Sequence, residues 1–257
     1  MPIAFTRAVS PRLAECETTQ EGRVDVARAV EQHATYEAAL AAAGLEVRRL
    51  APLDAFPDGV FVEDNALLLG AHAVILRPGA ASRAGETEST AAGLRAHFTL
   101  HRLDGGHVDG GDLLRIGSTL YAGLSSRTDE AGLHALAALI APLGYDVVPV
   151  PVAGGLHLKS AATFAGHDAS GTPILLHNPV WIAAGYFTGV EPLAVAPGED
   201  FGGNVLRVGE TLLTAADSPH TGDMLAARGF DIVTLDISEM RKADAALTCM
   251  SLISEAV

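Results

Sequence analysis

A unit of similar length recurs along the chain. Polar or reactive residues stand at the start of five short apolar runs: Asp64, Asp109, His157, Asn204 and Cys249. The intervals between them are 45, 48, 47 and 45 residues. A period of about 20 to 50 residues is typical of propellers and other repeat architectures. The chain is therefore predicted to consist of equivalent units that place these five residues in equivalent positions.

Most of these units combine a hairpin of two short strands with a helix and a further strand. The predicted strand pairs are Phe61–Leu69 with His72–Leu76, Leu113–Ile116 with Thr119–Ala122, Ser160–Phe164 with Ile174–Leu176, and Val205–Val208 with Thr211–Leu213. The predicted helices are Arg23–Ala43, Glu86–His97, Asp129–Pro142 and Ser218–Arg228. The predicted strands that end units are Leu45–Leu50, Val147–Val150 and Asp231–Leu235.

The two ends of the chain supply the halves of a fifth unit. Ile3–Val9 and Met250–Ile253 each predict one unpaired strand. Pairing these strands would close a ring without a free edge. We therefore predict an α/β protein with a single domain over residues 1–257, a five-fold pseudosymmetric α/β propeller closed by its terminal strands. The equivalent residues would face the common axis and meet there.

Composition restricts the possible partners and compartments. The formal net charge of −14 and the pI near 5.0 argue against nucleic acid or an anionic membrane surface, and they favour a cationic small molecule. No run of about 18 apolar residues occurs, and the first residues lack the regions of a signal peptide, so we expect a soluble, cytoplasmic protein. The two cysteines, Cys16 and Cys249, cannot form a disulfide framework and leave a thiol free for chemistry.

A thiol, an imidazole and carboxylates at equivalent positions predict a nucleophilic thiol enzyme. Each residue also has a structural explanation, because a single cysteine is commonly a buried small hydrophobe and a single histidine a structural residue. The remaining candidates could belong to turns, solvated strand ends or surface salt bridges: Asp109, Glu63, Asp64, Arg83 and Arg127. The agreement of Cys249 and His157 in phase with the repeat favours the catalytic interpretation.

A series of motifs resembles the dimethylarginine dimethylaminohydrolase family. These motifs are Phe56–Asp64 (FPDGVFVED), Arg77–Ala80 (RPGA) with Arg83, Asp109–Asp112 (DGGD), Gly123–Thr128 (GLSSRT), Gly155–Ser160 (GLHLKS) and Leu247–Ser251 (LTCMS), with Val24–Ala29 (VDVARA) on the first helix. The resemblance covers nearly the whole chain. It places the protein in the guanidine-modifying superfamily, whose fold is a five-bladed α/β propeller (pentein), in agreement with the repeat.

The resemblance implies hydrolysis of Nω-methylated arginine to citrulline and dimethylamine or methylamine, with no metal or organic cofactor. Cys249 would attack the guanidinium carbon and form an S-alkylthiouronium intermediate. His157 would protonate the departing amine and then activate water. Asp109 would orient His157 and contact the substrate, and Asp64, grouped with Glu63, would hold the guanidinium.

Further matched positions imply contacts with the amino-acid end of the substrate. Arg83 and Arg127 match α-carboxylate ligands, and Asp58 matches an α-amino contact. Two main-chain carbonyls and a nearby carboxylate are expected to complete the amine site: Ala243, Cys16 and Asp244.

Residues 12–23 are polar and lack periodicity, which is consistent with a mobile lid. Cys16 lies in this segment, where the family usually has leucine, and it is predicted to form a disulfide with Cys249 under oxidation. Zinc could inhibit at Cys249 and His157, but two ligands are too few for a structural site.

Three other functions are open. Arginine deiminases have an aspartate two residues after the histidine, whereas this chain has Lys159, which favours a methylarginine hydrolase. An amidinotransferase would keep the cysteine and histidine but transfer the amidino group to an amine. A non-catalytic binding propeller would have no need for the combined thiol, imidazole and carboxylates. The expected partner is a methylated arginine, bound by a monomer or a homodimer.

Overall fold

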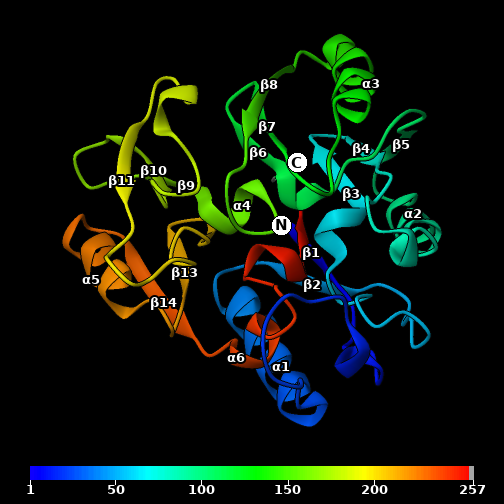
Figure 1. The fold of residues 1–257 in the computed structure, drawn as a ribbon, viewed down its shortest axis with the longest axis horizontal. Helices are drawn as coiled ribbons and strands as arrows, with labels where there is room; N and C mark the ends of the chain where they lie inside the picture. Colours follow the sequence, from blue (N-terminus) through cyan, green and yellow to red (C-terminus); the bar gives the residue numbers. More distant parts are fainter. Residues whose placement is uncertain (255–257) are drawn as a thin grey trace.

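The computed structural model describes residues 1–254, which contain five three-stranded sheets. In every sheet the middle strand pairs antiparallel with one neighbour and parallel with the other. Figure 1 shows the longer helices around the periphery and the terminal strand β1 near the centre. The prediction of an α/β fold built from five repeated sheets is confirmed.

The sheets combine strands that are close in sequence, except for the sheet that pairs the first described strand with the last. They are β15-β1-β2 (Leu252–Ile253, Ile3–Thr6, Glu46–Arg49), β3-β4-β5 (Ala66–Leu69, His72–Ile75, Thr99–Arg102), β6-β7-β8 (Leu113–Ile116, Thr119–Leu124, Asp146–Pro151), β9-β10-β11 (Ala162–His167, Pro173–His177, Glu191–Ala194) and β12-β13-β14 (Leu206–Val208, Thr211–Ala215, Asp231–Leu235). In the first sheet, Ala4 pairs antiparallel with Ile253 and parallel with Val47.

Helices make the crossovers that parallel strands require. The α-helices are α1 (Val26–Ala42), α2 (Glu86–Leu94), α3 (Glu130–Ile140), α4 (Leu158–Ala161), α5 (Pro219–Ala227) and α6 (Ser238–Arg241). The 3-10 helices are η1 (Leu13–Glu15), η2 (Val62–Asn65), η3 (Ala81–Arg83), η4 (Gly110–Asp112), η5 (Ala141–Leu143), η6 (Ala184–Tyr186) and η7 (Thr248–Met250). Between β10 and β11 the crossover contains only η6.

Local sequence signals define the two longest helices. The Asp25 carboxylate accepts a hydrogen bond from the Arg28 amide at the start of α1, and Asp129 accepts one from the Gly132 amide at the start of α3. These N-caps satisfy amides that have no partner within the helix. Gly44, just beyond α1, has a φ of 94°, which residues with a side chain rarely adopt.

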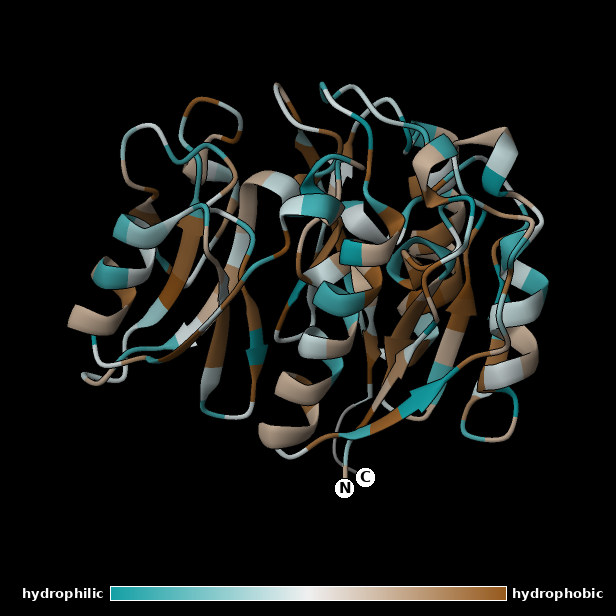
Figure 2. Ribbon diagram, turned by 90° about the horizontal axis from the view of Figure 1, so that it is seen from below, coloured by the Kyte–Doolittle hydropathy of each residue, from teal (hydrophilic) through white to brown (hydrophobic). Residues whose placement is uncertain are grey.

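Burial decreases from the middle strand of each sheet toward its parallel neighbour. Strands β4, β7, β10 and β13 are mostly buried, whereas β5 and β11 contain no buried residue. Figure 2 shows the most hydrophobic residues concentrated on the strands. Strands β5 and β11 have no counterpart among the predicted strands, because exposed edge strands lack the apolar runs that identify a strand, and Pro192 lies within β11.

Short helical turns occupy positions that the sequence predicts as strand. Turns η2 and α4 end directly before β3 and β9, and η7 ends two residues before β15 begins. These three strands therefore begin later than predicted. The N-terminal strand ends at Thr6 rather than Val9. A single turn has too few residues to show a helical period, so an apolar run that contains one reads as a longer strand.

No helix within residues 1–254 has the length and apolar character needed to cross a lipid bilayer.

Candidate active site

A small cavity brings together most of the predicted site residues. Its volume is about 20 Å³, which is close to the space that one water molecule needs. Nine of the eleven predicted residues line it: Asp58, Asp64, Arg83, Asp109, Arg127, His157, Ala243, Asp244 and Cys249. Within the described part of the chain, the other two, Glu63 and Cys16, lie outside this lining. Four residues without a predicted role also line the cavity: Glu17, Phe61, Leu156 and Ala245.

The backbone around His157 is held on both sides. His157 is the N-cap of α4, and its amide donates to the Ser160 hydroxyl at 3.2 Å. The next amide, that of Leu158, donates to the buried Asp112 carboxylate at 2.8 Å. These bonds fix the start of α4 and therefore the direction in which the imidazole leaves the chain.

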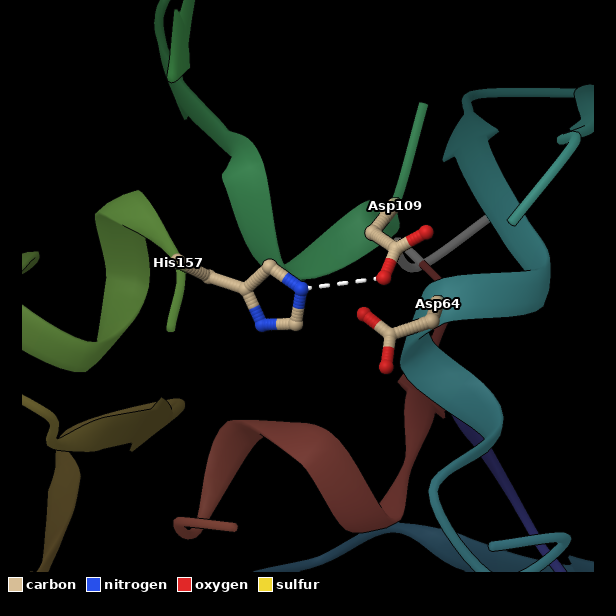
Figure 3. A group of neighbouring side chains, drawn as sticks. All are labelled: Asp64, Asp109 and His157. Carbon is tan, nitrogen blue, oxygen red and sulfur yellow. Dashed lines mark hydrogen bonds and ion pairs between the residues drawn. The ribbon is translucent and has the colours of Figure 1, made fainter. Parts of the chain in front are cut away.

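The imidazole of His157 meets the carboxylate of Asp109. Its Nε2 atom lies 3.0 Å from Asp109 Oδ2, as Figure 3 shows. The other carboxylate oxygen accepts the Gly79 amide at 2.7 Å, and the Asp109 amide donates to the Thr128 hydroxyl. Asp109 is 1% exposed, so this pair is shielded from water.

Asp64 approaches the same imidazole from η2 (Figure 3). Its Oδ1 atom accepts the Gly111 amide at 2.9 Å, and its Oδ2 atom accepts from Arg83 Nη1. A Cβ atom on Gly111 would lie 2.5 Å from His157 Nδ1 and 3.1 Å from Asp64 Oδ1. The imidazole and this carboxylate can come this close to the backbone because residue 111 has no side chain.

Arg83 is buried and holds several acceptors. Besides Asp64, its guanidinium donates to both oxygens of Glu86 and to the Phe61 carbonyl at 2.7 Å. Burial opposes its charge, but these carboxylates outweigh it and raise the Arg83 pKa well above its usual value. Arg83 is thus a fixed cation that orients Asp64.

Cys249 lies on η7 and faces the same cavity. Its sulfur accepts a hydrogen bond from the Ala246 amide at 3.4 Å. Burial raises the pKa of the thiol to about 12, with a further contribution from the carboxylates of Glu63 and Asp64. The free protein therefore holds a neutral thiol until a positive charge arrives beside it.

His157 has the opposite electrostatic environment. Burial alone would lower its pKa, but Asp64, Asp112 and Asp109 outweigh burial and raise the pKa to about 9. Burial would raise the Asp64 pKa, but His157 and Arg83 bring it below its usual value. The pair at neutral pH is therefore an imidazolium with a neighbouring carboxylate.

The far end of the cavity carries charges of both signs. Arg127 Nη2 lies 3.0 Å from Glu17 Oε2, and the second Glu17 oxygen accepts from the Ser82 hydroxyl. The Glu17 amide donates to Asp58 Oδ2 at 3.3 Å. Burial raises the pKa of Asp58 to about 6, although Arg83 opposes that shift.

Asp244 binds the segment predicted as a lid. Its carboxylate accepts from the Thr19 amide at 2.6 Å, from the Gln20 side chain at 2.6 Å and from the Thr18 and Thr19 hydroxyls. Asp244 has a φ of 54°, a left-handed conformation that aspartate tolerates better than most residues. This carboxylate fastens residues 18–20 beside the cavity.

Glu63 points to the other side of η7. Its carboxylate accepts from Lys159 Nζ at 2.5 Å and from the Thr248 hydroxyl at 2.9 Å. Asn204 joins the same group by donating to the Lys159 carbonyl and the Thr248 hydroxyl. A second, larger cavity of about 420 Å³ lies on this side, lined by Glu63, Lys159 and Thr248 among others. Residues from four different units therefore contact one another behind the small cavity.

Cys16 is half-buried in the lid segment. It packs against the hydrophobic cluster that Cys249 also contacts, and both thiols are free. Burial, with Asp58 nearby, raises the Cys16 pKa to about 11. The disulfide between them stays a prediction.

Comparison with curated proteins identifies close relatives. The N(G),N(G)-dimethylarginine dimethylaminohydrolase of Streptomyces coelicolor is 40% identical over 252 residues, which cover 96% of this chain and 95% of the relative. The enzyme of the same name from Pseudomonas aeruginosa is 32% identical over 90% of both chains. The chain belongs to the dimethylarginine dimethylaminohydrolase family. No protein-family model matches it.

Solved structures of the family share the fold. The Pseudomonas aeruginosa enzyme, crystallised as a cysteine-to-serine mutant with citrulline, matches 97% of this chain and 98% of its own, with a TM-score of 0.91 and 30% identity. A dimethylarginine dimethylaminohydrolase adduct with S-methyl-L-thiocitrulline gives a TM-score of 0.92. The N-terminal domain of the arginine dihydrolase ArgZ shares the fold at 22% identity.

Asp64, Asp109 and His157 could hold a metal ion, because their ligand atoms lie within 4.8 Å of one another. Each of these groups is already engaged, however. The guanidinium of Arg83 occupies one oxygen of Asp64, and the His157 pKa of about 9 favours the protonated imidazole over the neutral form that binds metals. In this member of the family the donor set suits a hydrogen-bonding cation better than a metal.

The sequence did not identify every residue of the cavity. Glu17 had no motif or periodicity to distinguish it from other charged residues of the lid. Leu156 directly precedes His157, and Ala245 directly follows Asp244, so proximity to these predicted residues is a usable signal for both. Gly111 and Asp112 lie in the Asp109–Asp112 motif, but a turn alone explains a DGGD sequence.

Proposed function

We propose that this protein hydrolyses Nω-methylated L-arginine to L-citrulline and dimethylamine or methylamine. The observation that carries the proposal is that the Cys249 thiol shares one cavity with the His157–Asp109 pair and the Asp64 carboxylate. The names of the Streptomyces and Pseudomonas relatives support it, as does the citrulline in the Pseudomonas complex.

When the substrate binds, the Cys249 thiol releases its proton to solvent, and the thiolate forms a bond to the guanidinium carbon and gives a tetrahedral adduct. His157 donates its proton to the methylated nitrogen, the carbon–nitrogen bond breaks, and the neutral amine leaves a cationic S-alkylthiouronium. Neutral His157 then removes a proton from water, whose oxygen bonds to the same carbon. This proton transfer restores the imidazolium. Expulsion of the thiolate, with loss of the new hydroxyl proton to solvent, then gives citrulline. Covalent catalysis divides attack on a resonance-stabilised carbon into two easier steps.

The charge of the substrate assists the first step. The thiol pKa of about 12 means that little thiolate exists in the free protein near neutral pH. A bound guanidinium places a positive charge next to the sulfur, which lowers the thiol pKa. Asp64 accepts hydrogen bonds from that guanidinium, and Glu63, on the opposite side of η7, holds Lys159 and Thr248 in place behind it.

The amino-acid end of the substrate binds at the opposite end of the cavity. Arg127 binds the α-carboxylate, with Arg83 beside it, and Asp58 accepts from the α-ammonium. The Ala243 and Cys16 carbonyls complete the amine site, and Asp244 fastens the lid. Paired contacts to a carboxylate and an ammonium favour a free amino acid over a simple guanidine.

We also propose that the five units form a single-domain propeller over residues 1–257. Asn204 contacts Lys159 and Thr248. Glu63 contacts the same two residues, and these contacts support convergence of the units on one axis. Convergence would bring together reactive residues that are separated by about one repeat in sequence.

Lys159 favours a hydrolase of methylated arginine over a deiminase of arginine. It occupies the position where deiminases have an aspartate, and its ammonium contacts Glu63 behind the small cavity. Loss of that carboxylate leaves room for N-methyl groups on the nitrogen that a deiminase would hold.

A product assay tests this function. Asymmetric dimethylarginine and arginine are supplied separately, and citrulline, dimethylamine and ammonia are measured. We expect citrulline with dimethylamine from the methylated substrate and little ammonia from arginine. Ammonia from arginine as the main product would identify a deiminase, and transfer of the amidino group to an added amine would identify an amidinotransferase. No product in any reaction would favour a binding protein.

Replacing Gly111 by alanine is expected to lower kcat/KM by about 10²-fold, because the new methyl group would displace the imidazole of His157 from its position beside Asp109. Gly185→Ala is the matched control, since a Cβ there meets no atom within 4 Å and the backbone is not left-handed. Both variants are compared by steady-state kinetics and thermal unfolding. Unchanged kinetics in Gly111→Ala would contradict the role given to the imidazole position.

A further inference from the structure

Glu17 reaches from the lid segment into the end of the small cavity that is assigned to the amino-acid group. One of its carboxylate oxygens lies 3.0 Å from Arg127 Nη2, and the other accepts from the Ser82 hydroxyl. Its own amide donates to the Asp58 carboxylate at 3.3 Å. The same residue therefore engages the cation and the anion at this end of the cavity.

The two contacts of Glu17 with Arg127 and Asp58 resemble those that an α-amino acid would make at this end of the cavity. An amino acid offers a carboxylate to an arginine and nitrogen-bound hydrogens to a carboxylate, and Glu17 supplies both groups from one residue. The hydrogen bond from Ser82, followed by the ion pair with Arg127, keeps the pKa of Glu17 below its usual value, so it is negatively charged at neutral pH.

The neighbouring contacts hold Glu17 in this position. Asp244 binds the next three residues of the lid, Thr18, Thr19 and Gln20. The space left in the cavity is about 20 Å³, far less than a molecule of the size of arginine occupies. A ligand must therefore move part of this lining before it binds.

We propose that Glu17 is a specificity-determining residue that occupies the amino-acid subsite of the free protein and competes there with the ligand. This inference rests on the proposed function, because that function assigns Arg127 and Asp58 to the amino-acid group. A ligand with both an α-carboxylate and an α-ammonium replaces both contacts of Glu17 when it displaces this residue. A ligand without the carboxylate does not replace the contact between Glu17 and Arg127. Its affinity therefore increases less when the charge of Glu17 is removed.

Calorimetric titration of Glu17→Gln with L-citrulline tests the proposal. The variant keeps the size of the side chain and removes its charge, so citrulline should bind about three- to tenfold more tightly than to the unmodified protein. The analogue of citrulline without its carboxylate is 4-ureidobutylamine. Its affinity should change by no more than about twofold. Glu17→Ala should show the same selectivity.

Glu15→Gln is the matched control. Glu15 belongs to the same segment and carries the same charge, but its carboxylate pairs with the exposed side chain of Arg12 at 2.5 Å. Citrulline affinity should therefore be unchanged in this variant. If citrulline affinity increases as much in Glu15→Gln as in Glu17→Gln, the effect arises from net charge alone. That result would overturn the proposal.

The remaining outcomes separate this inference from the proposed function. If citrulline binds Glu17→Gln no more tightly than it binds the unmodified protein, the proposed competition is overturned. The binding itself would leave the proposed function intact. Absence of citrulline binding in every protein of the set would overturn the proposed function, and the competition with it.

Discussion

Cys249→Ser is expected to lower kcat with asymmetric dimethylarginine by at least about 10⁴-fold. A serine hydroxyl ionises far less readily than a thiol, and no other nucleophile is proposed in the cavity. The neighbouring imidazolium donates a proton in the first step and therefore cannot also activate a hydroxyl there. Steady-state release of citrulline and single-turnover formation of a protein adduct measure the two consequences of the substitution.

The variant should still bind citrulline, because the substitution leaves Arg127 and Asp58, which are proposed to bind the amino-acid group, in place. Cys16→Ser is the matched control: it replaces the other thiol of the chain, which is half-buried in the lid, and should keep most of the activity. Retention of adduct formation in Cys249→Ser, or its loss in Cys16→Ser, would move the nucleophile away from Cys249.

His157→Asn is expected to lower kcat by about 10²- to 10⁴-fold, the range of general acid–base catalysis. Without the imidazole no group in the cavity is positioned to protonate the departing amine. Steady-state kinetics with the dimethylated substrate measure this loss. His134→Asn, at an exposed position on α3, is the control and should retain full activity.

The same substitution should change how stability depends on pH. A histidine ionises near pH 6.5 in an unfolded chain, whereas the His157 pKa in the folded protein is about 9. Its stabilising proton is therefore fully present below about pH 6.5 and is lost as the pH rises toward 9. Thermal unfolding from pH 6 to pH 9.5 should show a smaller decrease in His157→Asn than in the unmodified protein. An equal decrease would mean that His157 is not an imidazolium near neutral pH.

The repeat in the sequence predicted which residues come together. Asn204 illustrates this: it was selected only for its phase, and its side chain contacts Lys159 and Thr248 of the neighbouring units. The pairing of the first and last strands also followed from counting half-units at the ends. Periodicity succeeds here because equivalent units fold alike and place equivalent residues on the same side.

The sequence did not predict the directions of side chains within single helical turns. Glu63 and Asp64 are neighbours in one motif and were grouped together, yet they lie on opposite sides of η7 and line different cavities. The turn of η2 rotates one side chain away from the other, and four residues are too few to reveal a helical period. Arg83 was matched to a substrate carboxylate, and the structure adds its contacts with Asp64, Glu86 and Phe61.

The sequence alone determined the repeated α/β architecture, the family resemblance and the set of reactive residues, because period and motif are properties of order along the chain. Only the tertiary structure decided the protonation of His157 and Cys249, the partners of Glu63 and the position of Glu17. A pKa depends on burial and on charges brought together from distant segments. The contact of Glu17 with Arg127 likewise joins residues far apart in the chain, and no local pattern encodes it.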